Sequence, residues 1–218
     1  MTEHLRETTV ESVQVYEGVF LRVRKDVARL PDGSDHPREW VMHPGAAAMA
    51  ALGDDGRVLM VRQWRYPMRQ AYLEIPAGKI DPGETSLQTA RRELLEETGH
   101  AASEWALHTQ IHPAIGFSNE RIDIYLARGL TAQPARALDQ GELIDVEWCT
   151  LGELVDALRQ GRLPDVKTHI AVMHLQRLVD GDWPWPAFSP GQNLLPFWRT
   201  MMLPPETSWP PKAFVPSR

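Results

Sequence analysis

The chain has 218 residues, of which 43% are hydrophobic and 24% are charged, as expected for a compact protein with one large domain and at most a small appendage. Its formal net charge of −6 and its lack of a lysine/arginine block argue against nucleic acid or an anionic membrane as a partner. The longest apolar run, at about 45–52, is too short for a membrane helix, and a single cysteine, Cys149, with no signal-like start predicts a cytoplasmic location.

The order of predicted elements alternates between strands and helices. Residues 11–30 alternate like strands, with turns at 17–18 and 31–33, which predicts a small N-terminal antiparallel sheet. Strands follow at 46–52 and 58–62, joined by an Asp-Asp-Gly turn, and at about 71–75. A helix over 85–98 precedes strands near 105–111, 122–127 and 144–149 and helices at about 151–160 and 167–179. This order indicates a layered α/β or α+β domain.

The last segment, 182–218, differs in composition, because it holds nine of the 18 prolines and four of the eight tryptophans. Long helices and central strands are excluded there. We expect an arm that packs on its own domain or on a dimer interface, and a lid near the substrate is the alternative. The predicted organisation is a β-sheet at 1–43, the main domain at 44–181 and this arm at 182–218.

Three glutamates, Glu93, Glu96 and Glu97, share one face of the predicted helix, which begins at a capping box and ends at Gly99. Each like-charge pair costs a few tenths of a kcal/mol on an isolated helix, and a divalent cation would reverse the sign of that cost. Carboxylate oxygens suit magnesium or manganese, whereas no cysteine/histidine cluster suggests zinc. We expect core or surface roles for His112, His169 and His174. By spacing alone, a solvated acidic face is the preferred explanation.

The wider pattern changes this interpretation. Gly78, Glu84, Arg92, Glu93, Leu94, Glu96, Glu97 and Gly99 match the Nudix box, GX5EX7REUXEEXGU, at every position but the last, where His100 replaces an aliphatic residue. The sequence resembles a Nudix hydrolase, and the resemblance implies an α/β/α sandwich with a mixed sheet. It also implies hydrolysis of a nucleoside diphosphate linked to another group.

The same resemblance assigns roles to the box residues. It makes Glu93 and Glu97 the principal magnesium ligands, Glu96 a third ligand or a holder of metal-bound water, and the carbonyl of Ala77 a further ligand. Arg92 counts among the catalytic residues, and we expect it to pair with Glu84 and brace the loop against the helix.

The approach to the box, RQWRYPMRQAYLEIPAGKIDPGE, resembles that of ADP-ribose pyrophosphatases, and the similarity covers about residues 10–180. It implies magnesium-dependent cleavage of ADP-ribose, a small nucleotide, to AMP and ribose 5-phosphate by a homodimer that exchanges its N-terminal sheets. Arg65 and Arg38 are candidates to grip the phosphates, with surface ion pairs as the alternative. Trp40 is a candidate to stack on adenine, or else a core or interface residue. Glu39 beside it is a further candidate to contact substrate, with an ion pair to a neighbouring base as the alternative.

Glu120 lies in the loop GFSNE, where members of that family carry a mobile acidic residue that orients or deprotonates water. An ordinary exposed glutamate is the alternative, and Glu97 is the competing base. Glu142 and Asp145 are further candidates to reach the site. The rival functions are hydrolysis of another nucleoside diphosphate sugar or dinucleotide, and ligand binding without catalysis. Every catalytic glutamate is present, so we predict the enzyme.

Overall fold

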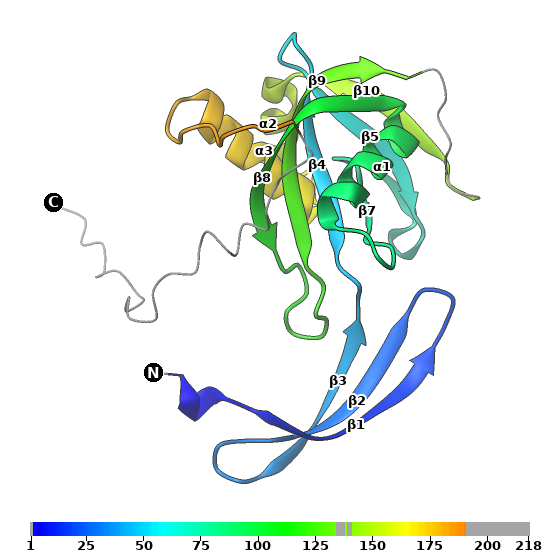
Figure 1. The fold of residues 1–218 in the computed structure, drawn as a ribbon, viewed down its shortest axis with the longest axis vertical. Helices are drawn as coiled ribbons and strands as arrows, with labels where there is room; N and C mark the ends of the chain where they lie inside the picture. Colours follow the sequence, from blue (N-terminus) through cyan, green and yellow to red (C-terminus); the bar gives the residue numbers. More distant parts are fainter. Residues whose placement is uncertain (1, 134–137, 139–140, 191–218) are drawn as a thin grey trace, which may run out of the picture.

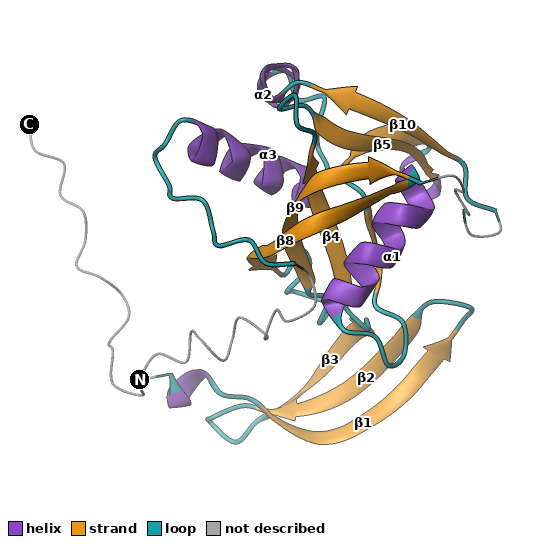
Figure 2. Ribbon diagram, turned by 45° about the horizontal axis from the view of Figure 1, so that its top comes forward, coloured by secondary structure: helices purple, strands orange, loops and turns teal. Residues whose placement is uncertain are grey.

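The computed structural model describes residues 2–133, 138 and 141–190 (Figure 1). After a short 3₁₀ turn at Glu3–Leu5, a three-stranded antiparallel sheet is formed by β1 (Thr8–Glu17), β2 (Arg22–Arg29) and β3 (Asp35–Met42), in that order. The predicted small N-terminal sheet is thereby confirmed. It lies apart from the other strands, and every residue of β1 is exposed (Figure 2).

A larger mixed sheet forms the centre of the chain, with the strand order β10-β5-β4-β9-β8. Strands β4 and β9 run parallel and the other pairs antiparallel; β6 adds to β5 and β7 adds to β4. The bounds are Ala46–Leu52 (β4), Val58–Arg65 (β5), Gln70–Glu74 (β6), Ala77–Lys79 (β7), His100–Ile111 (β8), Ile122–Ala132 (β9) and Ile144–Cys149 (β10), with a 3₁₀ turn at Tyr66–Met68.

Helices cover both faces of this sheet, α1 (Ser86–Thr98) on one and α2 (Leu151–Arg159) with α3 (Val166–Val179) on the other (Figure 2). Because side chains alternate along a strand, β4 serves both layers. Ala46, Ala48 and Ala50 belong to the core under α2 and α3. Ala47, Met49 and Ala51 belong to the core under α1. The predicted α/β/α sandwich with a mixed sheet is confirmed.

Helix α1 begins and ends where its local sequence predicts. The Thr85 side chain accepts a hydrogen bond from the backbone of Gln88, whose own side chain bonds back to Thr85, and Gly99 adopts φ 70° at the C-cap. Leu94 and Ala90 are fully buried against the sheet. The acidic face of the helix therefore has a fixed orientation relative to β7.

The first part of the C-terminal arm, 182–190, packs on its own domain. Ser189 exchanges two backbone hydrogen bonds with Trp105 of β8, both 3.0 Å long, and the Trp183 ring lies edge-on to His174 of α3. The rest of the arm, 191–218, lies outside the described residues, so the choice between arm and lid stays open there. None of the helices described is long and apolar enough to cross a membrane.

Candidate functional site

Glu93 lies directly over the backbone of Gly78. Strand β7 pairs with β4, and this pairing brings Gly78 under α1, opposite Ala47. A Cβ atom at residue 78 would lie 1.8 Å from Glu93 Oε1 and 1.9 Å from its Cδ. Only glycine allows this approach, so the first box residue, Gly78, and the helical glutamate Glu93 form one structural unit.

Glu97 is the most deeply buried acid of the helix, with 4% of its surface exposed. Its Oε2 accepts a hydrogen bond of 3.0 Å from the Ala77 backbone N–H. Burial, and next the charge of Glu93, raise the pKa of Glu97 to about 8. Burial also raises the pKa of Glu93, and the charge of Glu142 adds to the rise in both. For both carboxyl groups, burial and like charge therefore outweigh the contacts that favour the ionised form.

Arg92 connects the preceding loop to the acidic face of the helix. Its Nε and Nη2 bond the two carboxylate oxygens of Glu84 at 3.0 Å each, which forms the ion pair expected from the sequence. Its Nη1 donates to Glu93 at 2.8 Å and to Glu96 at 2.9 Å. The hydrogen bonds from Arg92 lower the pKa of Glu84 to about 2. Glu84 is therefore ionised, and its charge is balanced by Arg92. Glu93 and Glu96 share the single nitrogen Nη1 of the same arginine.

Arg65 stands at the end of β5 and is held by a buried carboxylate. Its Nε and Nη2 each donate a 2.7 Å hydrogen bond to Glu74, which is 2% exposed. Lys167 of α3 bonds the same carboxylate and also Asp165 at 3.0 Å. The charges of Asp165 and Glu97 contribute to raising the pKa of Arg65, after its hydrogen bonds to Glu74. Arg65 therefore lies near the glutamate cluster in a fixed orientation.

Glu120 lies in the loop between β8 and β9, next to the residues that lead into β4. Its Oε1 is 3.8 Å from His43 Nε2, and its backbone carbonyl accepts a 2.9 Å hydrogen bond from the His112 ring. The first residues of β4, from Ala46 to Ala48, pair with β7 on one side and with the start of β9 on the other. The Glu120 loop, which leads into β9, and the Gly78 segment therefore lie on either side of the start of β4.

The three candidates on β3 lie outside the glutamate cluster. Arg38 forms two hydrogen bonds, of 2.9 and 2.6 Å, with Glu7, and the Trp40 indole N–H donates to Asp26 at 2.8 Å. Glu39 is exposed and faces Lys25 across the sheet. Within this chain they belong to the small sheet, and their predicted contact with substrate stays a prediction.

Residues 42–170 match the NUDIX domain family, and residues 7–41 match the nucleoside diphosphate sugar hydrolase N-terminal domain. The chain belongs to the Nudix hydrolase family. A relative described as a methanol dehydrogenase activator from Bacillus methanolicus is 38% identical, over 81% of this chain and 96% of its own. A relative described as an ADP-ribose pyrophosphatase from Bacillus subtilis (strain 168) is 36% identical, over 79% and 94% of the two chains. A crystal structure of an ADP compounds hydrolase shares the fold, with a TM-score of 0.71 and 19% identity over 82% and 97% of the chains.

Nudix hydrolases generally need a divalent metal ion, and the donor set of this site suits one. The Glu93 carboxylate occupies the space that a Cβ atom at Gly78 would fill, and Glu97, one helical turn further on, is buried. Among the residues described, no three acidic, histidine or cysteine side chains are already grouped as a metal site. In the structure, Arg92 holds Glu93 and Glu96 through one nitrogen atom.

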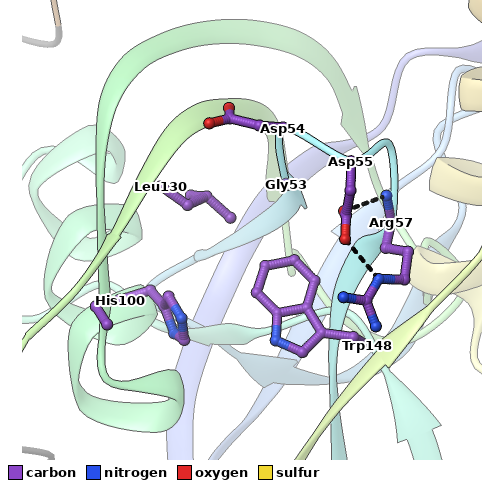
Figure 3. Close-up of a pocket in the computed structure, with 8 residues that line it drawn as sticks. Gly53, Asp54, Asp55, Arg57, His100, Leu130 and Trp148 are labelled. Atoms are coloured by element: carbon purple, nitrogen blue, oxygen red, sulfur yellow. Dashed lines mark hydrogen bonds and ion pairs between the residues drawn. The ribbon is translucent and has the colours of Figure 1, made fainter.

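The departure from the Nudix box at His100 has a local explanation. The His100 ring lies edge-on to Trp148 at 5.6 Å, and its Nδ1 bonds the Thr98 carbonyl at 2.9 Å. Both rings line a pocket of about 290 Å³ that is closed on another side by the β4–β5 turn (Figure 3). This pocket contains none of the predicted site residues, so the departure at His100 lies away from the glutamate cluster.

Three residues of the site region are missing from the sequence-based candidates: Glu74, Lys167 and His43. A glutamate between two apolar residues, as in Leu73-Glu74-Ile75, is a weak sign of a buried charge. The partner lysine lies 93 positions away, and no local pattern connects the two.

Proposed function

We propose that this Nudix hydrolase is a magnesium-dependent ADP-ribose pyrophosphatase, which cuts its substrate to AMP and ribose 5-phosphate. One observation carries the proposal: Glu97 is buried and Glu93 is largely covered beside the Gly78 segment, while the nearby arginine, Arg92, makes its bidentate contact with Glu84. Acids that are mutually repulsive and buried favour a divalent cation between them. The similarity to a curated ADP-ribose pyrophosphatase supports the substrate.

Glu93, Glu97 and Glu96 would hold the magnesium ion together with the Ala77 carbonyl. When bound, such an ion neutralises diphosphate oxygens and lowers the pKa of a water molecule. Arg92 makes its bidentate contact with Glu84, and its Nη1 holds Glu93 and Glu96 next to each other. Glu84 thus fixes the arginine, and the arginine limits the positions of two metal ligands.

Arg65 is suited to bind a phosphate oxygen. Its Nε and Nη2 are both engaged by Glu74, and 41% of its side chain is exposed. The remaining nitrogen, Nη1, makes no hydrogen bond within the described residues and is therefore the donor for substrate. Either Glu97 or Glu120 takes the proton from the attacking water. The kcat of Glu120→Gln distinguishes the two, because a wild-type value would exclude Glu120 as the base.

We also propose that the enzyme is a homodimer built through its N-terminal sheet. Within the described residues, no α-helix covers the three-stranded sheet and the outer edge of β1 is unpaired. A sheet of this size needs a packed hydrophobic face for independent stability. Val10, Val13 and Val15 of β1 are each about half exposed, at 50%, 47% and 53%. A second copy would cover them and would bring Arg38, Glu39 and Trp40 towards the partner's site.

The division of the chain into 1–43, 44–181 and 182–218 is part of this proposal. So is a cytoplasmic location, which the single free thiol of Cys149 supports.

The decisive experiment is product analysis on ADP-ribose, ADP-glucose, GDP-mannose, a diadenosine polyphosphate and a nucleoside triphosphate, with and without magnesium. Glu97→Gln is measured alongside, with Glu104→Gln on the exposed surface of β8 as the matched control. We expect magnesium-dependent release of AMP from ADP-ribose, lost in Glu97→Gln and retained in Glu104→Gln. Preference for another diphosphate would move the substrate assignment. No turnover by a folded, metal-loaded protein would favour a ligand-binding module.

A second candidate function is activation of a methanol dehydrogenase, because the relative of that description is similar over 81% of this chain. Adding the wild-type chain and Glu97→Gln separately to a methanol dehydrogenase assay tests it. Equal stimulation by both would indicate a role that does not depend on hydrolysis.

A further inference from the structure

The loop of Glu120 is held by the linker that joins the N-terminal sheet to the central sheet. Val41 and Ser118 form a parallel bridge, and the Ser118 hydroxyl donates to the Val41 carbonyl at 3.1 Å. The backbone N–H of His43 donates to Asn119 Oδ1 at 2.8 Å. The linker therefore fixes the two residues that precede Glu120 in the chain.

The His43 ring is oriented by a second contact. The backbone N–H of Gly45 donates to His43 Nδ1 at 3.1 Å, so Nδ1 must carry a lone pair. A neutral imidazole with an accepting Nδ1 has its proton on Nε2. This Nε2 is the atom that faces Glu120 Oε1, at 3.8 Å. The backbone of the linker thus selects the tautomer that points a donor at Glu120.

Both side chains are largely covered, with 18% of His43 and 28% of Glu120 exposed. Burial lowers the pKa of His43; the charge of Glu120 opposes this shift and that of Lys79 adds to it. The ring is therefore neutral at pH 7. A distance of 3.8 Å exceeds a hydrogen bond, and a shift of about 1 Å in the loop closes it. Catalytic contacts of this kind tighten when substrate binds.

We propose that His43 is a positioning residue, whose Nε2–H holds the Glu120 carboxylate in the orientation needed to accept a proton from the attacking water. The inference rests on the proposed function, with Glu120 as the general base. A carboxylate on a loop rotates freely unless a donor fixes one oxygen, and misplacement by about 1 Å costs on the order of 100-fold in rate.

Two substitutions at residue 43 separate the roles of the two ring nitrogens. His43→Asn keeps an acceptor near Nδ1 for Gly45 but removes the donor that faces Glu120. His43→Gln carries its amide donor near the place of Nε2 and loses the Nδ1 acceptor. If the inference is right, His43→Asn lowers kcat about tenfold or more with KM unchanged, and His43→Gln stays within about threefold of wild type.

Glu120→Gln and the double variant with His43→Asn complete the cycle. We expect Glu120→Gln to lower kcat about 100-fold and the double variant to be no slower, because the histidine acts through the carboxylate. Equal losses in both His43 variants, or losses that multiply in the double variant, would overturn the inference. If Glu120→Gln keeps the wild-type kcat, the general-base assignment fails and the positioning role fails with it.

Nitrogen NMR of the His43 ring provides a readout that does not depend on turnover. The wild-type chain should show a protonated Nε2 and an unprotonated Nδ1 at pH 7, and the Nε2 resonance should shift in Glu120→Gln. A protonated Nδ1 would contradict the inference even in a fully active enzyme. If the wild type hydrolyses no ADP-ribose, this measurement alone decides the contact, and the proposed function fails separately.

Discussion

Replacement of Gly78 by alanine tests the metal cradle with a single methyl group. The added Cβ would lie 1.8 Å from Glu93 Oε1 and 1.9 Å from Cδ, whereas real Cβ contacts do not fall below about 3.0 Å. The Glu93 carboxylate therefore has to move by at least about 1.2 Å, which is more than half of a Mg–O bond of roughly 2.0–2.1 Å. Magnesium demands near-ideal octahedral geometry, so this movement removes or distorts one ligand.

The expected effect is on metal-dependent rate much more than on folding. We expect kcat/KM for ADP-ribose to fall about 100-fold at a fixed magnesium concentration, with a higher magnesium concentration for half activation. Crowding of this kind costs about 1–3 kcal/mol of unfolding free energy, which is less than the roughly 5–15 kcal/mol of a typical domain. The variant should therefore fold, as circular dichroism and a urea titration would show.

Gly152→Ala is the matched control, because a Cβ added there has no described atom within 4 Å beyond its chain neighbours and the backbone of its own helix. Gly152 lies in α2, where alanine is favoured over glycine by about 1 kcal/mol, so the control should be fully active and no less stable than wild type. A folded Gly78→Ala variant with the wild-type magnesium dependence would refute the idea that Glu93 must approach this backbone.

Two further predictions concern stability. Glu74→Gln should lower the unfolding free energy by about 3–5 kcal/mol in urea titrations, because it leaves Arg65 and the buried Lys167 without their shared carboxylate. Glu104→Gln, which removes an exposed ion pair, should cost less than about 1 kcal/mol, and equal costs would argue against the buried network. Burial and His174 lower the pKa of His108 from 6.5 to about 4, so between these pH values the unfolded chain binds more protons. Stability should therefore fall as the pH drops from 6.5 to about 4, by at most about 1.4 kcal/mol per pH unit, and this slope should flatten in His108→Gln but not in the control His36→Gln.

Local signals account for the parts of the fold that the sequence predicts well. The capping box at Thr85 and the glycine at the C-cap place α1 within a residue of the predicted 85–98, because both signals act over one helical turn. Strand β7 was not predicted, since its three residues, Ala77–Lys79, show no periodicity and exist through pairing with β4. A strand of this length depends on a partner some 30 positions away, which no local pattern reveals.

The same limit applies to the candidate site. The box spacing identifies Glu93, Glu96 and Glu97, but not that a Cβ at Gly78 would collide with Glu93. The sequence gives Arg65 as a candidate phosphate ligand, but it does not reveal that a buried glutamate fixes two of its nitrogens. These features come from contacts between distant elements, which are decided by packing.

The environments of Glu84 and Glu97 explain why one segment carries two kinds of glutamate. Glu84 receives two hydrogen bonds from Arg92 and a third, of 2.7 Å, from the Thr89 hydroxyl, so its charge is satisfied within the protein. Glu97 is far more buried but receives one backbone hydrogen bond from Ala77. A carboxylate that is fully partnered braces the structure, whereas one that is buried and short of partners is available to an incoming cation. In the proposed function, the arginine of the box therefore braces Glu84, and Glu97 is the carboxylate that remains for the metal ion.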